Sequence, residues 1–427
     1  MKKVFKFIVI VLLALAIKPA LAQETEGTST DTLGAAVNKL QGVVELMQRL
    51  KVTGYLQVQS QFTDSLGNAF AGGVFPANTD KRFGVRRGRL KFAYNTLLTS
   101  FVAQFDLTEK GLATKDIYMV VRDPWSQTAS LTAGVFNRPF GYEIAYSSSA
   151  RESPERARFT QTLFPGERDL GYMLTIQGPK TSSWNFLKIQ GGFFAGNGIN
   201  PETDNKKDFI GQISISKSAL DERIKYGFGV SYYNGGVLQT TTNVYNMSDG
   251  VFSKDANLVT TGKFAKRQYM GLDAQFAVET PLGITTLRGE YVKGTQPSAK
   301  GSPNSFAIAV PVVQDLYIRA VKGAYVYFVQ GIAGTKHQFV LKYDMFDPNT
   351  KVSGNQIGAG TATGVTATTA GDLKYTTFGI GWVYAYNSNV KLMAYYDKVK
   401  NETSNNLAGY SKDLNDNVFT LRLQFKF

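Results

Sequence analysis

The chain has 427 residues, of which 47 are Lys or Arg and 33 are Asp or Glu, so its formal net charge is +14. It contains no cysteine and one histidine, His337, which excludes disulfide bonds and Cys/His metal clusters. No HExxH motif is present, nor a GxSxG motif with suitable partners, so the familiar hydrolase signatures are absent from the sequence.

The first 22 residues have the pattern of an export signal. Three lysines lie within the first six residues, an apolar run covers 7–17, and a small-residue cleavage motif covers 20–22. We expect the mature chain to begin at Gln23. This leader carries four lysines and no acid, so its removal lowers the net charge from +14 to +10. No later segment approaches the roughly 18 apolar residues of a membrane-spanning helix, so a membrane span has to be built from strands.

Residues 23–51 are expected to form a periplasmic linker and a helix. Five apolar residues recur at alternating spacings of four and three, namely Leu33, Val37, Leu40, Val44 and Met47. They would form one stripe on a helix of about four turns. Two interpretations stay open: the helix packs on the barrel rim or plugs the pore, or it forms a short coiled coil that joins subunits.

From Val52 onward, apolar and polar residues alternate with a period of two, which predicts strands that are apolar on one face. Sixteen candidate strands are predicted, at 52–62, 83–94, 99–108, 115–122, 130–137, 169–178, 185–196, 208–216, 224–234, 267–279, 284–293, 323–330, 337–346, 374–386, 389–400 and 418–427. Short connections alternate with longer ones, as the periplasmic turns and external loops of outer-membrane barrels do. We therefore predict an all-β fold, a closed antiparallel transmembrane β-barrel of about 16 strands over residues 52–427. The alternative is a soluble β-sandwich.

Basic residues recur at positions that would face the lumen of this barrel. On the second predicted strand, Arg87, Arg89 and Lys91 share one parity and lie about 7 Å apart. Arg86 has the opposite parity and requires a bulge or a rim position. The other cations at lumen parity are Lys188, Arg267, Arg288, Lys342, Lys391, Arg422 and Lys426. Acids at the same parity are Asp106, Asp116, Asp273, Glu290, Asp344 and Asp397. Two interpretations stay open: an anion-selective ladder, or cations neutralised by facing acids.

The loop after the fifth predicted strand, 138–168, is expected to fold inward and narrow the pore. Its arginines alternate with acids and hydroxyl groups, and these candidates for anion binding are Arg138, Arg151, Arg156, Arg158 and Arg168. A guanidinium group matches the geometry of phosphate, so arginines at a constriction would suit oxyanions. Alternatively, Arg156 and Arg168 pair with glutamates of the same loop and hold its shape.

Several stretches resemble the phosphate-selective porin O and P family. They are Arg86-Arg87-Gly88-Arg89-Leu90, Gly134-Val135-Phe136-Asn137-Arg138-Pro139-Phe140-Gly141, Phe164-Pro165-Gly166-Glu167-Arg168-Asp169-Leu170-Gly171, Phe194-Ala195-Gly196-Asn197-Gly198 and Lys342-Tyr343-Asp344-Met345-Phe346-Asp347-Pro348-Asn349-Thr350. The resemblance spans about residues 52–427. It implies a trimeric, sixteen-stranded anion channel, sometimes with an N-terminal periplasmic helix. Phosphate selectivity in that family depends on a lumen arginine ladder and constriction lysines, and this chain has no lysine between Arg138 and Asp169.

The sequence thus predicts a passive outer-membrane diffusion channel for small anions such as phosphate. We expect a homotrimer in outer-membrane lipid, without catalysis, cofactor, metal or nucleic-acid partner. One alternative is a general or sugar-type porin, with Tyr55, Tyr118 and Tyr233 as a stacking track. Another is a plugged structural or adhesive barrel. A barrel lipase or protease would need a paired histidine, whereas His337 is interpreted as a solvated turn residue.

Overall fold

The computed structural model describes residues 32–70, 73–256, 261–306, 313–360 and 365–427. The chain divides into two compact units, residues 1–48 and residues 49–427. The predicted signal peptide, 1–22, and the start of the linker lie outside the described residues, so the cleavage at Gln23 stays a prediction. No helix in the described ranges is both long and apolar enough to cross a membrane.

The N-terminal helix is confirmed as α2 (Thr32–Arg49), which is five turns long rather than four. Among the stripe residues whose side chains are described, Val37, Leu40, Val44 and Met47, the exposed fraction lies between 43% and 71%. A stripe this exposed is compatible with a partner helix, and the coiled coil stays a prediction.

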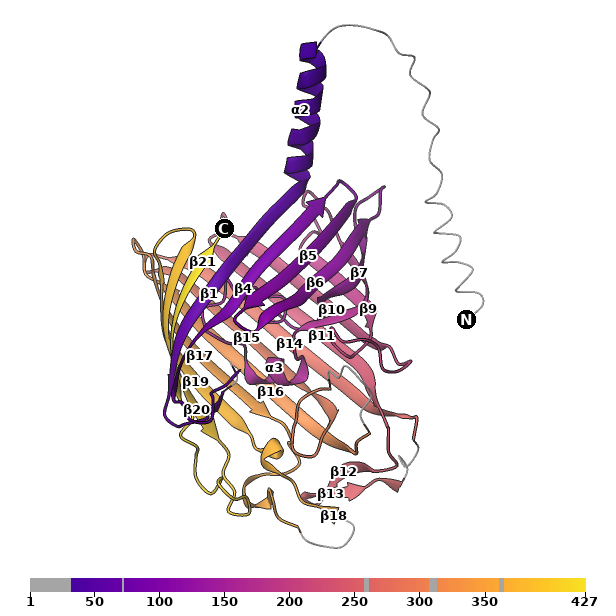
Figure 1. Cartoon of the computed structure of the whole chain (residues 1–427), viewed down its shortest axis with the longest axis vertical. Coiled ribbons are helices and arrows are strands. Elements are labelled where there is room, and N and C mark those ends of the chain that lie inside the picture. The colour runs from indigo at the N-terminus through magenta and orange to yellow at the C-terminus, as the bar shows by residue number, and fades with distance from the viewer. Residues whose placement is uncertain (1–31, 71–72, 257–260, 307–312, 361–364) are drawn as a thin grey trace. The chain divides into compact units, whose positions relative to one another are not determined.

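Sixteen antiparallel strands of the described chain close into one barrel, as predicted (Figure 1). They are β1 (Leu50–Thr63), β4 (Lys81–Asn95), β5 (Thr99–Thr108), β6 (Gly111–Arg122), β7 (Ala129–Asn137), β8 (Arg168–Gln177), β9 (Leu187–Phe194), β10 (Asp208–Ala219), β11 (Ile224–Leu238), β14 (Phe264–Thr280), β15 (Gly283–Ser298), β16 (Leu316–Gly331), β17 (His337–Asp347), β19 (Tyr375–Ala385), β20 (Val390–Asn401) and β21 (Val418–Lys426). Each strand pairs with its neighbour in the chain, and β21 pairs with β1 to close the cylinder. Closure pairs both edges of the sheet, so neither edge strand is left open.

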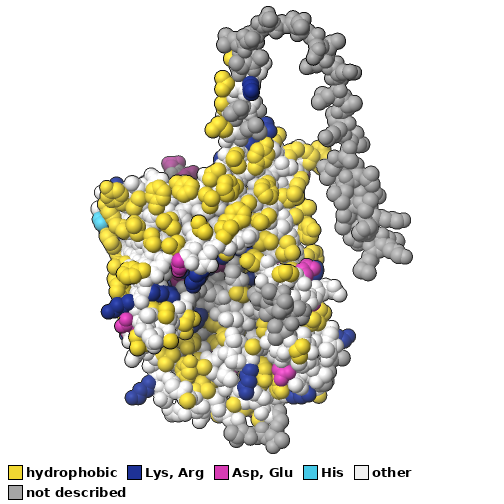
Figure 2. Space-filling view, viewed as in Figure 1, with side chains coloured by type: hydrophobic (Ala, Val, Ile, Leu, Met, Phe, Trp, Pro, Cys, Tyr) yellow, Lys and Arg dark blue, Asp and Glu magenta, His cyan; other side chains and the backbone are white. Residues whose placement is uncertain are grey.

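The two faces of the wall follow the predicted period of two. In β21, Thr420, Arg422 and Gln424 are buried, whereas Leu421 and Leu423 are exposed. The exposed apolar residues of the strands form a band on the outer surface of the barrel, and charged side chains gather beyond it, towards the loops (Figure 2). This is the pattern of a wall whose outer face contacts lipid and whose inner face is polar.

Connections at one end of the barrel are short and those at the other end are mostly long. The short connections are 96–98, 123–128, 178–186, 220–223, 281–282, 332–336 and 386–389. The long loops carry small elements that the sequence did not predict: β2 (Ala69–Phe70), β3 (Gly73–Val74), β12 (Val244–Ser248), β13 (Val251–Lys254), β18 (Val365–Thr366), η2 (Gly354–Gln356) and η3 (Ala370–Asp372). The exception at the long-loop end is the two-residue connection 109–110 between β5 and β6.

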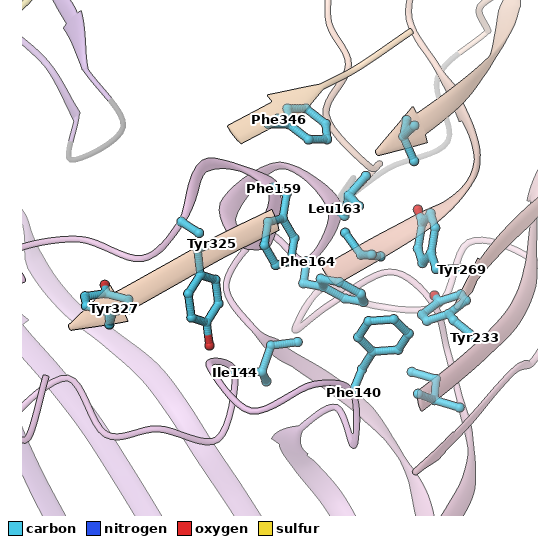
Figure 3. Packing of buried hydrophobic residues seen from close by; sticks show 14 of the residues in the cluster. Phe140, Ile144, Phe159, Leu163, Phe164, Tyr233, Tyr269, Tyr325, Tyr327 and Phe346 are labelled. Carbon is cyan, nitrogen blue, oxygen red and sulfur yellow. The ribbon is translucent and has the colours of Figure 1, made fainter. Parts of the chain in front are cut away.

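The loop 138–167, called the inner loop here, folds into the barrel and carries α3 (Arg158–Leu163) (Figure 1). Its aromatic side chains meet tyrosines of the wall in the main buried apolar cluster (Figure 3). The Phe159 ring stacks on the Tyr325 ring of β16 with 6.1 Å between centroids. A Cβ atom at Gly323 would lie 2.5 Å from Phe159, so glycine is required where α3 approaches β16. The inward fold predicted for this loop is confirmed.

Candidate functional site

The base of the inner loop is fixed by a carboxylate of the wall. Glu290 of β15 accepts hydrogen bonds from the backbone N–H groups of Tyr142 (3.1 Å) and Glu143 (3.0 Å). Gly141 has φ +62°, and a Cβ atom there would overlap the Glu290 carboxylate. The close approach of loop and wall therefore depends on glycine at this position.

The tip of the inner loop presents Glu155 to three arginines of the wall. Arg86 donates to both carboxylate oxygens of Glu155, at 2.6 and 2.7 Å, and Arg87 and Arg422 each lie 3.3 Å away. Burial opposes ionisation of Glu155, but the three guanidinium groups outweigh it and hold its pKa well below the usual range. Arg86 reaches the lumen because the β1–β4 register shifts between Gln57 and Val58, which confirms the bulge expected from its parity.

A second group of charges links the end of the inner loop to β6. The Glu167 carboxylate forms ion pairs with Arg156 at 2.5 Å and with Arg168 at 2.7 Å. Arg168 also forms an ion pair with Asp116 at 2.9 Å. Burial again opposes ionisation, and Arg156 and Arg168 lower the pKa of Glu167. Beside them, Arg138 pairs with Asp169 at 3.0 Å. These pairs agree with the second interpretation made from the sequence, in which the arginines pair with acids and hold the shape of the loop.

Other predicted lumen cations also meet acids. Arg89 lies 3.6 Å from Asp106, and Lys342 lies 3.0 Å from Asp344. Arg267 pairs with Asp208, and Arg288 pairs with Glu152 of the inner loop. Most of the predicted arginine ladder is therefore compensated by carboxylates, which weakens the arginines as free anion sites.

Six of the predicted cations have other surroundings. Arg151 is buried in the inner loop and donates to the carbonyl of Ser153 at 3.3 Å. Arg158 lies over the Tyr375 ring at 4.0 Å, and Lys426 is exposed at the short-turn end of β21. Lys391 donates to the carbonyl of Ser149 at 2.8 Å. In the described part of the chain, the side chains of Lys91 and Lys188 take part in no ion pair and no hydrogen bond.

Lys91 and Lys188 line a cavity of about 500 Å³ between the inner loop and the wall from β4 to β10. Its basic lining residues are Arg89, Lys91, Arg138, Arg156, Arg168 and Lys188, and its acidic one is Asp116. The four arginines have carboxylate partners, so the two lysines supply the positive charge that no ion pair neutralises. Asp273 is within electrostatic range of Lys188 but forms no ion pair with it.

Two basic residues of the lumen, Lys115 and Arg319, were not predicted from the sequence. Lys115 shares the parity of lipid-facing Ile117, but the register between β5 and β6 shifts next to it, which makes Lys115 a bulge residue. Its side chain lines a groove of about 460 Å³, which Arg86 also lines. The sequence did contain a signal for this position, because a lysine with lipid-facing parity requires a bulge, just as Arg86 does. Arg319 pairs with Asp372 at 2.8 Å, both fully buried, and was overlooked because β16 begins seven residues before the predicted strand.

The remaining aromatic candidates do not form one track. Tyr118 lines the cavity, whereas Tyr233 is buried beneath the inner loop and donates to Asp208 at 2.6 Å. His337, at the start of β17, accepts a hydrogen bond from Trp382 at 3.0 Å and stacks on Tyr384.

No family model matches the chain, and no curated protein matches it either. Among solved structures, it is similar to OprB of Pseudomonas putida, with 10% identity, coverage of 96% of this chain and 100% of that chain, and a TM-score of 0.54. The outer membrane channel DcaP of Acinetobacter baumannii matches with 12% identity, coverage of 88% and 97%, and a TM-score of 0.51. OmpF of Salmonella typhi matches with 11% identity, coverage of 88% and 97%, and a TM-score of 0.52. At such identities, these likenesses show that the chain shares the barrel fold of outer-membrane porins.

Proposed function

We propose that the protein is a passive diffusion channel of the outer membrane that favours small anions. The closed sixteen-stranded barrel, its apolar outer band and its polar interior support a water-filled path across a membrane. The fold shared with DcaP, which is described as an outer membrane channel, supports the same function. The inner loop narrows this path, and the chain needs no catalytic step or cofactor to act in this way.

The observation that carries the anion preference is the cavity beside the inner loop. Its arginines are compensated by acids, whereas Lys91 and Lys188 face it without a carboxylate partner in the described chain. A lysine ammonium group is a strongly hydrated point charge, which attracts a passing anion without holding it in a fixed geometry. Weak, repeated attraction is what conduction requires.

We propose phosphate and related oxyanions among the permeant ions, in line with the sequence resemblance to the phosphate-selective porin O and P family. The matched stretches include Arg86 to Leu90 on β4, where Arg86 and Arg87 hold the inner loop through Glu155 and Arg89 pairs with Asp106 of β5. A homotrimer in the outer membrane remains part of this proposal.

The test is the reversal potential of the purified protein in a planar bilayer under a KCl gradient. Wild-type protein should prefer anions, and the double variant Lys91→Gln/Lys188→Gln should lower the anion-to-cation permeability ratio roughly fivefold or more, since a unit charge at 4 Å in water contributes about 1 kcal/mol. Lys254→Gln, at the exposed last residue of β13 in a long loop, is the matched control and should leave the ratio unchanged. Block of the chloride current by added phosphate would indicate phosphate binding, and its absence would indicate a general anion pore.

The second candidate is a plugged structural or adhesive barrel. It is favoured by the inner loop's contacts with opposite parts of the wall, since Phe159 packs on β16 while Glu155 meets β4 and β21. A purified protein that inserts but gives no conductance would support this candidate. Cation preference, or a ratio unaffected by the two lysine substitutions, would contradict the anion channel.

A further inference from the structure

We infer that the cavity beside the inner loop binds sugar acids, which are small carboxylates that carry several hydroxyl groups. The hydroxyl groups of the ligand bind a row of neutral polar side chains on the barrel wall, and its carboxylate binds Lys188. The inference rests on the proposed anion channel, for which it names a class of solute. The residues of the row lie outside the stretches that carry the resemblance to the phosphate-selective family, so that resemblance does not imply this site.

Four uncharged polar side chains form the row, one from each of four consecutive strands. They are Ser130 of β7, Thr175 of β8, Gln190 of β9 and Gln212 of β10, and all four line the cavity of about 500 Å³. Each residue of the row is paired directly with the next one across the strands. Such neighbours on one face of a sheet lie about 5 Å apart, which is close to the distance between hydroxyl groups on opposite sides of a sugar ring.

The row has free capacity to accept hydrogen bonds. Gln190 Nε2 donates to Thr175 Oγ1 at 3.3 Å, and Gln212 Nε2 donates to the carbonyl of Gly141 in the inner loop at 2.8 Å. Within the described chain, the Ser130 hydroxyl and the side-chain oxygens of the two glutamines have no hydrogen-bond partner. These three oxygens therefore remain available to a ligand in the cavity.

Free acceptor oxygens select a ligand that can donate. Chloride has no proton to donate, and hydrogen phosphate has a single hydroxyl group. A sugar acid has several hydroxyl groups, each of which can donate to the row and accept from it. The row also contrasts with the charged part of the same cavity lining, where Arg168 and Asp116 form an ion pair. A ligand with both hydroxyl groups and a charge uses both kinds of lining.

Lys188 supplies the charge at one side of the row. It lies two residues before Gln190 on the same face of β9, about 7 Å along the strand. Its side chain lines the cavity and forms no ion pair within the described chain. An ammonium group attracts a carboxylate without the fixed fork of a guanidinium group. A cavity of this volume is within the usual range for sites that bind small molecules.

The test is isothermal titration calorimetry of the purified protein in detergent with D-glucuronate, D-glucose and acetate. D-glucose lacks the carboxylate of D-glucuronate, and acetate lacks its hydroxyl groups. D-glucuronate should bind roughly tenfold more tightly than either compound, because two hydrogen bonds to neutral groups together contribute about a factor of ten. This measurement needs no membrane, so its result does not depend on conduction.

The double variant Thr175→Val/Gln190→Met removes hydrogen-bonding groups of the row while keeping the side-chain volume and the charge of the cavity. It should lower the affinity for D-glucuronate roughly tenfold, to the affinity for acetate. Ser130→Ala is a milder change that should lower the affinity about threefold, and it provides the test if the double variant does not fold. Lys188→Gln should lower the affinity for D-glucuronate to that for D-glucose.

The matched control is Thr377→Val, because Thr377 is a buried residue of β19 that does not line the cavity. This control should bind D-glucuronate as tightly as wild type. Equal affinities of wild type for D-glucuronate and acetate, or an undiminished affinity in Thr175→Val/Gln190→Met, would overturn the site. Anion preference in bilayers without binding of D-glucuronate would contradict this inference alone, and binding without anion preference would contradict the proposed function alone.

Discussion

Asp416, in the loop 402–417, is a buried carboxylate without an ion-pair partner in the described chain, and its Oδ1 has no hydrogen-bond donor. Burial raises its pKa to about 6, although Arg158 opposes the rise. A carboxyl whose pKa is higher in the folded state stabilises the fold below its unfolded pKa of about 4, and this contribution is lost as the pH rises through about 6. We therefore expect Asp416→Asn to raise the unfolding midpoint at pH 8 and to leave it nearly unchanged at pH 4.

The measurement is the midpoint of thermal unfolding between pH 4 and pH 8. Asp249→Asn is the control, because Asp249 is exposed at the β12–β13 turn with φ +51°, a conformation that Asn also accepts. If Asp416→Asn and wild type showed parallel pH profiles, Asp416 would not be the titrating group.

The lumen cations could be predicted at the level of single residues, and their partners could not. Parity along a strand is a local property, so it correctly placed Arg87 inside the barrel and required a bulge for Arg86. Glu155, which meets both, comes from a loop 68 residues beyond Arg87, and no local pattern shows which acid will fold back onto which strand. The anion selectivity that we propose therefore rests on the two cations without an ion-pair partner in the described chain, Lys91 and Lys188, which parity alone did not distinguish from the arginines.

At the scale of elements, the inner loop is held by two kinds of contact. On one side, α3 packs its apolar residues on the wall, and on the other side charged groups meet β4 and β21. Phe159 is fully buried and stacks on Tyr325. Phe159→Ala should loosen the docking of the loop by roughly 3–5 kcal/mol, the usual cost of deleting a buried aromatic side chain. The backbone hydrogen bonds between the barrel strands should stay intact.

The measurement is limited trypsin digestion of the folded protein, since Arg156 and Arg158 directly precede Phe159 and become accessible when the loop undocks. We expect cleavage within 138–167 in Phe159→Ala and noisier single-channel currents. Phe83→Ala, at an 85% exposed position of β4, is the control. Equal resistance of all three proteins would mean that the charged contacts alone hold the loop.

The sequence predicted all sixteen barrel strands because each of them carries its own alternation of apolar and polar residues. It did not predict α3, because a helix of six residues is too short to show a 3.6-residue period. The two-residue strands β2, β3 and β18 were missed for the same reason, since they form through pairing with other parts of the loops. Length of the repeating pattern, more than element type, separates what could be predicted from what could not.

At the scale of the whole molecule, the barrel depends on one long-range pairing, that of β1 with β21. The register joins Tyr55 to Lys426 and Thr63 to Val418, across nearly the full length of the chain. The alternation of the last strand predicted a closing role, but the register depends on geometry around the entire cylinder. Gly54 and Phe427 complete the pair by exchanging backbone hydrogen bonds of 3.1 and 3.0 Å.

Gly54 lies where the closing strand leaves no room for a side chain. A Cβ atom there would be 2.6 Å from the Arg89 carbonyl and 2.6 Å from the Phe427 ring. Gly54→Val should therefore hinder closure, at an overpacking cost of about 1–3 kcal/mol or more. The readout is the fraction of protein that migrates as a folded barrel in unheated gels, which should fall in Gly54→Val.

Phe427→Ala added to Gly54→Val removes one of the two overlaps and should recover part of the folded fraction. Gly42→Ala in α2, where a Cβ atom meets nothing within 4 Å, should leave that fraction unchanged. If Gly54→Val closed as efficiently as wild type, the β1–β21 seam would have to tolerate a shift in register. A one-residue slip would turn the lumen-facing side chains of β21, Arg422 among them, towards lipid. The seam that closes the barrel would then also fail to place Arg422 at the inner loop, so closure and the lumen charge pattern should be lost together.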